Sequence, residues 1–572
     1  MKFLSKAFLK ELWSITKGYW TSEDKWKAYA LAVAIIALQV IYVSSLVTYN
    51  AWQKDFYNTI QAVDPDAFFF YLKYWPMYMV FFIFIEVNRD YLMQWLEIRW
   101  RTWMVNHFVG RWLGDQTYYL LQIIRSDENS PVDNPDQRIS DDIRLFVNYV
   151  LNLTLGVLNA IMKLSSFSVV LWNLSGLLQF TVLNTEVSLP GYMVWLAILY
   201  ALLGCVFTLV VGNPIVKLNY KQQEYEANFR FGLARIREYC ESIASFRGES
   251  MESFDAMKRF YTVRDNFKRI MTRQWWLSWV TNLHWRIGFL FPYLVGVPRV
   301  FSGDMQFGGL MQTAVAFQHV ENALAYLVLH YYSATEASFA QLQAVVERLS
   351  DFKKAMADAE STLINDQLEF EENDGQSIEV KSLTLYKPDG REMIRDLNLS
   401  IQRGDKLMIT GPSGRGKSTL LKTLAGIWPY GKGTVLAPSS AHRIFVPQKA
   451  YMPMGTLRDI LLYPTNRTDI TNEQIADLLR LCNLPQLVDR IDEVANWSQA
   501  LSLGEQQRVS FVRLFLLKLD WIFLDESTSA LDVDNEALMY RLLDVYCPHA
   551  TIVSVAHRLY LKEFHTQELV LD

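Results

Sequence analysis

The stretch from Gly411 to Ser418 constrains this chain more than any other, because it requires a strand before it and a helix after it. It reads Gly-Pro-Ser-Gly-Arg-Gly-Lys-Ser and matches G-x-x-x-x-G-K-[ST], the pattern of a phosphate-binding loop. Residues 406–410 read as a buried strand, and residues 419–425 read as a helix whose N-terminus would face an anion. A glycine-rich turn is the alternative, which this context disfavours.

The loop therefore predicts a site for a nucleoside triphosphate. Its glycines let backbone N–H groups surround an oxygen-rich anion. Lys417 supplies a positive charge for the β- and γ-phosphates, and the Ser418 hydroxyl is a ligand for Mg²⁺. The residues expected to bind ATP here are Gly411, Pro412, Ser413, Gly414, Arg415, Gly416, Lys417, Ser418 and Thr419.

The first 340 residues or so contain long runs without charge, whereas the remainder reads as soluble. No charged residue occurs from Ala28 to Gln53. Such a run exceeds the roughly 20 apolar residues that cross a bilayer, and it is too long for the apolar core of a signal peptide. Similar runs follow, and they predict six spans at about 28–50, 67–88, 147–173, 191–213, 275–300 and 306–335.

Positive charge predicts the orientation of these spans. Lys2, Lys6, Lys10 and Lys17 precede the first span, and the long connectors after the second and fourth spans are rich in Arg and Lys. These segments are expected in the cytoplasm, where the phosphate-binding loop would meet ATP. Continuous helical patterns in both connectors predict helices that extend well beyond the membrane. The net charge of −5 gives no indication of a nucleic-acid partner, and the four cysteines form no metal-binding pattern.

The expected organisation is a transmembrane domain at 1–345, a linker of polar helix and acidic residues at 346–372, and a nucleotide-binding domain at 373–572. The fold class follows: an α-helical membrane domain with six transmembrane helices, fused to an α/β P-loop ATPase domain.

A second acidic signal lies about 110 residues after the loop. Residues 521–524 are apolar and end in two carboxylates, Asp525 and Glu526. We expect Asp525 to hold Mg²⁺ through water, and Glu526 to polarise a water molecule for attack on the γ-phosphate. A buried strand that simply ends at a surface is the alternative. The pairing with the upstream loop favours the catalytic interpretation.

Residues 501–508, Leu-Ser-Leu-Gly-Glu-Gln-Gln-Arg, resemble the signature motif of ABC-transporter ATPases. Other positions fall in the order of that family. Gln448 matches the Q-loop, which implies a role in catalysis and in binding Mg²⁺. Ser529-Ala-Leu-Asp532 matches the D-loop, and His557 matches the switch histidine. The resemblance implies exporter-like architecture with ATP and Mg²⁺ as cofactors.

The signature departs from the common Leu-Ser-Gly-Gly-Gln at Leu503 and Glu505. In the family this loop contacts ATP held by another nucleotide-binding domain, so Ser502, Gly504 and Glu505 are expected to face the partner's ATP. One P-loop and one signature make the chain a half-transporter, and a homodimer is the default assembly. Tyr386 is the candidate to stack on adenine; a tyrosine at a strand end is the alternative.

The membrane half narrows the resemblance. Residues 134–142, Asn-Pro-Asp-Gln-Arg-Ile-Ser-Asp-Asp, resemble a motif of the YddA and SbmA/BacA-type bacterial proteins and of the peroxisomal subfamily D transporters. Residues 172–176 and 189–195 resemble the bacterial group more specifically. This implies uptake of peptides or other bulky hydrophilic compounds, including cobalamin-like ones, across a bacterial inner membrane. Fatty acyl-CoA or lipid export, a non-transporting ATP-gated membrane protein, and a proton-driven carrier with a regulatory ATPase domain stay open.

Ionisable residues inside the predicted spans are candidates for a substrate cavity, because such residues usually face a bundle interior or water. They are expected either to bind an anionic substrate or to relay protons. Structural pairing, or a position beyond the bilayer, is the alternative for each. The candidates are Lys163, His284, Arg286, His319 and Glu321, with His330 as a further one.

Overall fold

The computed structural model describes residues 5–125, 134–182, 185–332, 338–365, 368–373, 375–439, 442–465 and 467–571. The chain divides into two compact units. The first unit comprises Met1–Gly110 and Val132–Lys353, and the second comprises Arg111–Pro131 and Lys354–Asp572. Residues 111–125, which lie in the first predicted cytoplasmic connector, thus group with the predicted nucleotide-binding domain.

The first unit is mostly helical. Its elements are α1 (Lys6–Trp20), α2 (Lys25–Gln61), α3 (Pro65–Leu72), most of α4 (Trp75–Leu113), α6 (Pro135–Gln137), α7 (Ile143–Ser175), the hairpin of β1 (Leu177–Val182) and β2 (Thr185–Pro190), α8 (Tyr192–Glu238), α9 (Cys240–Phe246), α10 (Glu249–Phe301), α11 (Phe307–Tyr332) and the first part of α12 (Phe339–Asn365). Helix α5 (Thr117–Arg125) belongs to the second unit.

Four stretches in the described part of the chain are long and apolar enough to cross a membrane: Lys25–Gln61, Pro65–Ile123, Pro135–Ser175 and Tyr192–Glu238. Large apolar side chains on α4 are left in the open, with Val80 67%, Phe84 61% and Val87 62% exposed. A face of this kind is stable against lipid rather than water. The predicted fifth and sixth spans lie in α10 and α11, and the count of six remains a prediction.

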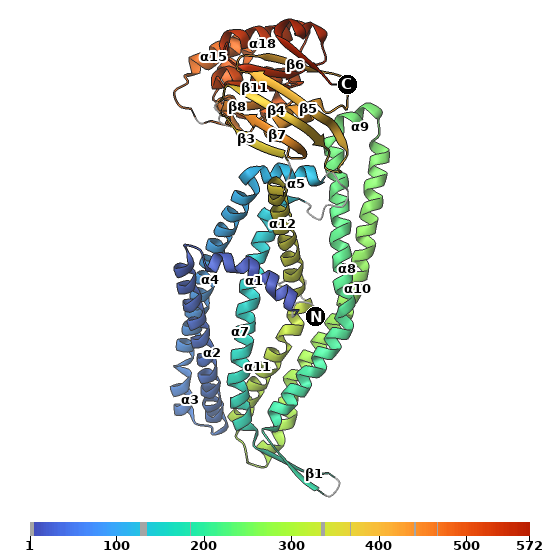
Figure 1. Ribbon diagram of the computed structural model, residues 1–572. Helices are drawn as coiled ribbons and strands as arrows, with labels where there is room; N and C mark the ends of the chain where they lie inside the picture. The colour runs from blue at the N-terminus through green and yellow to red at the C-terminus, as the bar shows by residue number, and fades with distance from the viewer. Residues whose placement is uncertain are drawn as a thin grey trace. The chain divides into compact units, whose positions relative to one another are not determined.

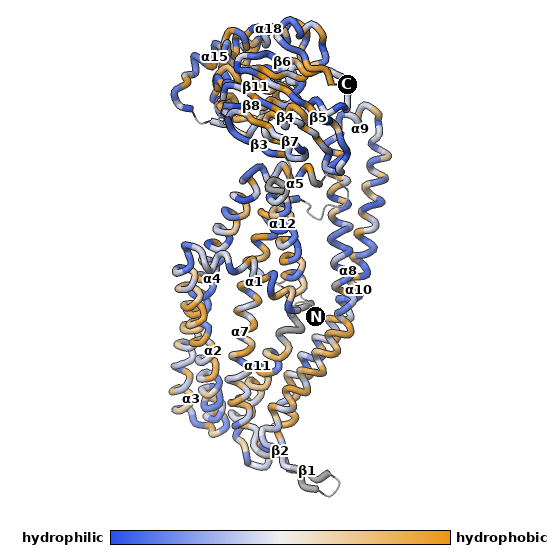
Figure 2. Tube along the Cα trace, viewed as in Figure 1, coloured by the Kyte–Doolittle hydropathy of each residue, from blue (hydrophilic) through white to orange (hydrophobic). Residues whose placement is uncertain are grey.

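Helices α8 and α10 run side by side over most of their length (Figure 1). Both are hydrophobic toward the β1–β2 end and hydrophilic toward α9, as Figure 2 shows. In the hydrophilic part, the buried amide of Asn266 donates to the carbonyl oxygen of Leu218 at 3.0 Å and to Oε1 of Gln222 at 2.9 Å. These bonds satisfy a polar group between the two helices. The chain therefore forms the long hairpin that the sequence predicts, with α9 at its turn.

The second unit contains two sheets. In one, the strands lie in the order β13 (Gln567–Val570), β6 (Lys406–Thr410), β12 (Thr551–Val555), β11 (Trp521–Asp525) and β8 (Arg443–Val446), and all neighbours are parallel. In the other, the order is β3 (Leu368–Glu372), β7 (Gly431–Ala437), β4 (Ser377–Tyr386) and β5 (Glu392–Gln402). A short pair joins β9 (Gly455–Thr456) to β10 (Val494–Ala495).

Strand β3 lies where the sequence predicts an acidic linker. It pairs in parallel with β7, so the second sheet begins before residue 373. Leu368 and Phe370 alternate with Glu369 and Glu371, and both apolar side chains pack against the core of the sheets. Alternation of this kind is typical of a strand with one buried face. The four charges in the segment, including Asp374 outside the described residues, obscured that pattern.

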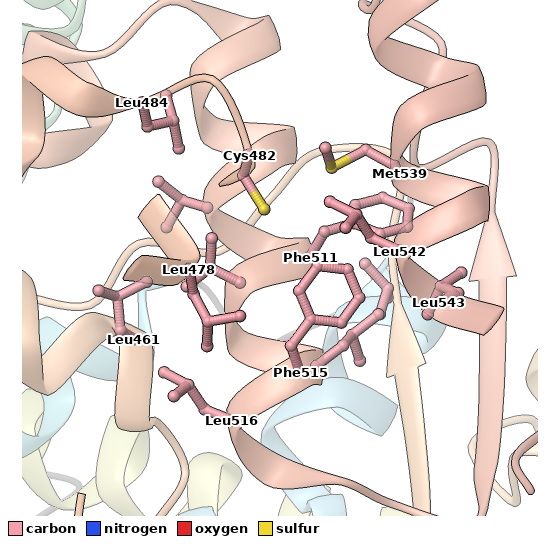
Figure 3. Close-up of a cluster of buried hydrophobic side chains, with 14 of the residues drawn as sticks. Leu461, Leu478, Cys482, Leu484, Phe511, Phe515, Leu516, Met539, Leu542 and Leu543 are labelled. Carbon is pink, nitrogen blue, oxygen red and sulfur yellow. The ribbon is translucent and has the colours of Figure 1, made fainter. Parts of the chain in front are cut away.

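The helices of the second unit are α5, the end of α12, α13 (Lys417–Leu424), α14 (Leu457–Leu462), α15 (Asn472–Leu481), α16 (Trp497–Ala500), α17 (Leu503–Leu517) and α18 (Val533–Tyr546). Figure 3 shows how Phe511 and Phe515 of α17 meet Leu478 of α15 and Met539 of α18. Both phenylalanines are at most 1% exposed. Burying one such side chain contributes about 2–3 kcal/mol. This packing fixes α17, whose first turn carries the signature motif.

The topology of the parallel sheet determines where the functional loops lie. The phosphate-binding loop follows β6, Gln448 follows β8, Glu526 follows β11 and His557 follows β12. Because these strands are adjacent and parallel, their carboxyl ends share one edge of the sheet. Four segments that are up to 146 residues apart in sequence are thereby brought together (557 − 411 = 146).

Candidate functional site

The phosphate-binding loop connects β6 to α13 and depends on glycine backbone geometry. Gly411, Gly414 and Gly416 have positive φ angles of 138°, 84° and 91°. A Cβ on Gly411 would lie 2.2 Å from the carbonyl oxygen of Leu571, so a side chain has no room there. Gly416 caps α13 without a side-chain hydrogen bond, which leaves backbone N–H groups of the first turn for an anion.

Lys417 lies across this loop and is 6% exposed. Its Nζ donates to the carbonyl oxygens of Gly411 and Pro412, both at 2.9 Å. The ammonium group is therefore held at the loop, where phosphate oxygens could replace the carbonyl groups as acceptors. Ser413 and Arg415 lie in the same loop, and the Thr419 hydroxyl lies 4.0 Å from the sulfur of Met393.

Ser418 and Asp525 form a compact set of oxygen ligands. The Ser418 hydroxyl donates to Oδ1 of Asp525 at 2.7 Å, and Asp525 is 8% exposed. Burial raises the pKa of Asp525, and the charge of Glu526 adds to the rise, while the Ser418 hydrogen bond, Lys422 and Lys417 oppose it. A carboxylate and a hydroxyl are ligands that Mg²⁺ prefers, so this set fits the predicted metal. No group of three or more His, Cys, Asp and Glu suited to a metal occurs in the described ranges.

Glu526 lies between two other predicted catalytic residues. Gln448 donates from Nε2 to Oε2 of Glu526 at 3.0 Å, and Nε2 of His557 lies 2.9 Å from Oε1 of Glu526. Glu526 has a φ of 47°, a left-handed conformation that is uncommon for residues other than glycine. Its backbone N–H donates to the carbonyl oxygen of Val555 on β12, which helps to hold this conformation. Two side chains thus hold one carboxylate in place, an arrangement that suits the predicted role of Glu526 in polarising a water molecule.

The signature motif forms the N-terminus of α17. The Ser502 hydroxyl donates to Oε2 of Glu505 at 2.8 Å, and the Ser502 backbone N–H donates to the same oxygen at 2.9 Å. Together with the bond from the Glu505 N–H back to the Ser502 hydroxyl, this forms a capping box. Burial acts to raise the pKa of Glu505, but the Ser502 and Gln486 hydrogen bonds outweigh it and lower that pKa. Glu505 is thus built into the start of the helix as a charged group.

Gly504 and Leu503 differ in their surroundings. A Cβ on Gly504 would lie 3.2 Å from the carbonyl oxygen of Ala530, so the signature and the D-loop approach closely. Leu503 is 62% exposed, so its side chain is not part of the hydrophobic core. Asp532 caps α18, accepting hydrogen bonds from the backbone N–H and the side-chain amide of Asn535 at 2.8 and 2.9 Å. These bonds lower the pKa of Asp532.

Two residues that sequence reasoning missed connect these loops. Gln507 of α17 is 4% exposed; it donates to the carbonyl oxygen of Gln448 at 3.1 Å and accepts from the N–H of Ala530 at 2.9 Å. The Q-loop and the D-loop are therefore both tied to the signature helix. Gln507 lies two residues after Glu505, inside the quoted motif, and its position there was the available signal.

Glu536 of α18 is the second missed residue, and it is 2% exposed. It accepts hydrogen bonds from Thr528 at 2.5 Å, from Arg558 at 2.8 Å and from Tyr560. Arg558 also donates to the carbonyl oxygen of Leu531 at 3.0 Å. One buried carboxylate thus joins the loop after β11, the D-loop and the segment that carries His557. In a sequence, an acidic residue in the first turn of a helix is explained by its favourable interaction with the helix dipole. That explanation gave no reason to expect Glu536 to connect three loops.

Tyr386 ends β4, and its surroundings are aromatic and basic. The indole N–H of Trp428 donates to the Tyr386 carbonyl oxygen at 3.2 Å, and the Lys432 ammonium lies 5.9 Å from the centre of the Tyr386 ring. Stacking of Tyr386 on adenine stays a prediction.

The predicted substrate-cavity residues fall into separate groups. Nε2 of His284 on α10 lies 3.0 Å from Oε1 of Glu321 on α11. His319 packs its ring on Phe167 at a centroid distance of 4.1 Å. Lys163 lies over the ring of Tyr42 at 5.9 Å, and Arg286 lies over Trp285 at 5.9 Å. The structure therefore brings His284 and Glu321 together. It also places Lys163 near enough to His319 for an electrostatic interaction, whereas Arg286 has a different neighbour.

Comparisons with known proteins agree with this geometry. Residues 15–301 match the family model "ABC transporter transmembrane region 2", and residues 394–529 match the model "ABC transporter". The inner membrane ABC transporter ATP-binding protein YddA of Escherichia coli is 32% identical over 95% of this chain and 94% of that protein. The lysosomal cobalamin transporter ABCD4 of Mus musculus is 29% identical over 83% of this chain and 80% of that protein.

A solved structure supports the fold. The structure of a bacterial Atm1-family ABC exporter with ATP bound superposes with a TM-score of 0.72, covering 95% of this chain and 93% of that one at 15% identity. The predicted resemblance to the YddA-type group and subfamily D is confirmed, as is the fusion of a helical membrane domain to an ATPase domain. The chain belongs to the ABC transporter family, as a half-transporter whose ATPase domain couples ATP hydrolysis to transport.

Proposed function

We propose that this protein is a homodimeric, ATP-driven transporter that takes up peptides or other bulky hydrophilic compounds through a bacterial inner membrane. The observation that carries the proposal is the contact of Glu526 with both Gln448 and His557, beside a complete phosphate-binding loop. An ATPase domain that only senses nucleotide would not need this hydrolytic arrangement. The nucleotide-binding domain works in the cytoplasm, where ATP is available, and the membrane domain contacts lipid.

Each residue of the ATP site has a role in this proposal. The loop N–H groups and Lys417 bind the phosphates, and Glu526 polarises the attacking water while Gln448 and His557 orient it. Ser418, Gln448 and Asp525 would hold Mg²⁺, which neutralises phosphate charge when it is bound. Ser502, Gly504 and Glu505 face the ATP of the partner subunit, and Asp532 lies beside that interface. Two bound ATP molecules then close the two ATPase domains against each other.

The movement would reach the membrane helices through the cytoplasmic tips at 134–139 and 229–246. The first tip is anchored by Asp142, which is 2% exposed and accepts hydrogen bonds from Arg138 at 2.7 Å and from Arg348 of α12 at 2.5 Å. At the second tip, Phe246 of α9 is 87% exposed. A rigid anchor and an exposed aromatic side chain are suited to transmitting force and to docking, respectively.

The proposed cargo is inferred from the relatives of this chain. ABCD4 is named a cobalamin transporter, and the YddA resemblance carries the expectation of peptides and bulky hydrophilic compounds. Export of fatty acyl-CoA or lipid is the alternative, which the resemblance to subfamily D leaves open. A screen of labelled peptides, cobalamin and acyl-CoA for stimulated ATPase activity of the reconstituted protein separates these cargo classes.

The central test measures cargo accumulation in proteoliposomes. Glu526→Gln should retain ATP binding but lose turnover by about 10²-fold or more, because it removes the base that polarises water. It should also abolish accumulation, and Lys417→Ala should do the same by weakening ATP binding. Wild-type turnover in Glu526→Gln would contradict the assigned role.

The remaining alternatives give different results in the same vesicles. A non-transporting, ATP-gated membrane protein would let cargo equilibrate with ATP bound but not hydrolysed, and no gradient would form. A proton-driven carrier would lose accumulation when an uncoupler is added. Accumulation that persists with an uncoupler and vanishes in Lys417→Ala supports the ATP-driven transporter.

A further inference from the structure

A cavity of about 280 Å³ lies among α8, α10 and α11 of the first unit. All three helices contribute polar lining residues, among them Cys205, Thr208, Asn282, His284, Glu321 and Asn322. These residues lie inside the predicted spans at 191–213, 275–300 and 306–335. Within the predicted spans, the cavity thus combines a mostly apolar wall with a few polar groups, and ionisable groups in such a place are costly and usually functional.

The His284–Glu321 pair in its wall is held in one geometry. The His284 ring stacks on Tyr200 at a centroid distance of 4.2 Å and an interplanar angle of 14°. The Tyr200 hydroxyl donates to the His284 carbonyl oxygen at 2.5 Å. A Cβ on Gly204 would lie 2.4 Å from the His284 ring, so glycine makes room for the ring. Packing thus aims the imidazole at the Glu321 carboxylate rather than leaving it free to rotate.

Glu321 is the acidic residue among the described residues of the cavity wall. Glu321 is 5% exposed, and His284 is its hydrogen-bond partner through Oε1; its Oε2 has no partner among the residues that the structure describes. No Lys or Arg occurs among the described residues that line the cavity. Asn282, Asn322 and Thr208 add neutral hydrogen-bonding groups, and the indole of Trp285 adds an aromatic face. A wall of this kind attracts a cation and repels an anion.

We propose that this cavity is a cargo subsite for a primary ammonium group, bound by the Glu321 carboxylate and oriented by His284. The proposal rests on the proposed transport function for its biological role, but the charge selection is a property of the cavity itself. For His284, the sequence left an anionic substrate open, whereas the cavity favours a cationic one. Lys163, Arg286 and His319 do not line this cavity and take no part in the proposed subsite.

The cavity contains its own reporter, because the Cys205 thiol is part of the wall. Cys240 is exposed, whereas Cys482 and Cys547 are buried in the second unit, so a Cys240→Ser background leaves Cys205 as the accessible thiol of the described chain. Full-length protein in lipid nanodiscs is treated with a methanethiosulfonate that carries an ammonium group, or with one that carries a sulfonate. Mass spectrometry then gives the rate of modification at Cys205. The rate of each reagent at Cys205 is divided by the rate of the same reagent with a small neutral thiol in solution. This division cancels the intrinsic reactivities of the two reagents.

The normalised rate should favour the ammonium reagent by about tenfold, because a cleft of one sign concentrates the opposite charge. Glu321→Gln keeps the size of the side chain and should bring the ratio close to one. Glu86→Gln removes an acidic group of α4 that does not line the cavity, and it should leave the ratio unchanged. A ratio near one in the parent, no effect of Glu321→Gln, or no reaction of Cys205 with either reagent would overturn the proposal.

A second measurement connects the subsite to cargo. Tri-lysine, tri-lysine with acetylated side chains and the fully acetylated peptide are compared as stimulators of ATPase activity in the nanodiscs. Stimulation should require at least one free ammonium group, and Glu321→Gln should raise the half-maximal concentration about tenfold or more without changing the KM for ATP. If the thiol result holds and none of the peptides stimulates, the ammonium subsite stands and the proposed peptide cargo falls. Equal stimulation by the fully acetylated peptide would contradict the subsite.

Discussion

At the scale of single residues, Asp525 shows how burial and function oppose each other. Its carboxylate lies at the end of a fully buried strand, beside Glu526 and under Ser418. Burial and the neighbouring charge raise its pKa, so the folded, nucleotide-free protein binds a proton there more tightly than the unfolded chain does. The stabilising effect of this group is therefore present below the unfolded pKa, and it is lost as the pH rises through the folded pKa.

Asp525→Asn should accordingly raise the thermal unfolding temperature of the nucleotide-free protein at pH 8, where the wild-type carboxylate is charged and unpaired by metal. The same variant should lose most of the stabilisation that Mg²⁺ and ATP give to the wild type. In the wild type, the apparent affinity for Mg²⁺ should fall as the pH drops toward the raised pKa. Thermal scans at several pH values, with and without Mg²⁺ and ATP, check this; equal behaviour of both proteins at pH 8 would contradict it.

Glu536 gives a second prediction at this scale. Glu536→Ala leaves Thr528, Arg558 and Tyr560 without their shared acceptor. The free energy of unfolding should fall by about 2–4 kcal/mol. This loss is smaller than for a fully buried ion pair, because Arg558 keeps access to water. Glu536→Gln should lose less, since it retains an acceptor oxygen. Glu563→Ala, at an exposed position nearby, serves as the control and should change stability by less than about 0.5 kcal/mol.

At the scale of elements, helix α17 joins the core of the second unit to its signature loop. Phe511 lies in the cluster shown in Figure 3 and is fully buried. Phe511→Ala should cost about 3–5 kcal/mol of stability, because it removes a large apolar side chain and leaves a cavity. Val545→Ala on α18 is a matched control, since Val545 is 69% exposed. Thermal unfolding followed by tryptophan fluorescence measures both, and similar melting temperatures for the two variants would contradict the assignment of this core.

The sequence predicted those elements whose signals are local. The loop at 411–418 with its flanking strand and helix, and the strand at 521–525, lie where their residues indicated. Helix α1 was not predicted, because its packing depends on a distant contact: Tyr19 stacks on Trp100 of α4 at 5.5 Å. The hairpin of β1 and β2 was missed as well, since its pairing partners follow a membrane helix and carry few turn signals.

In the ATP site, too, the sequence predicted what local motifs mark and missed what depends on distant contacts. Motif spacing predicted Gln448, Glu526 and His557 as catalytic residues, but their mutual contacts follow from the strand order of the sheet. Gln507 and Glu536 act through partners up to 59 residues away, so no local pattern marks them. In the membrane domain, the sequence offered six ionisable candidates and no means to rank them. The packing of α8, α10 and α11 then selected His284 and Glu321, because these two share one cavity.

At the scale of the whole molecule, the question is whether one chain can complete an ATP site. The chain contains one phosphate-binding loop and one signature, and Ser502 is occupied by the capping box with Glu505 in its own helix. The proposal that the signature serves a partner's ATP makes each site a product of two chains. That arrangement predicts complementation between two variants that are each inactive as homodimers.

Lys417→Ala disables the loop, and Ser502→Ala combined with Gly504→Asp disables the signature, since even a Cβ on Gly504 crowds the carbonyl oxygen of Ala530. When both subunits are co-expressed with different affinity tags and purified through both, one site of the mixed dimer carries both defects and the other carries none. ATPase activity should therefore return to as much as about half of the wild-type rate, because one of two sites is intact. If each chain instead built its own site, both sites of the mixed dimer would be defective. Activity no higher than that of either homodimer would then rule out the shared site.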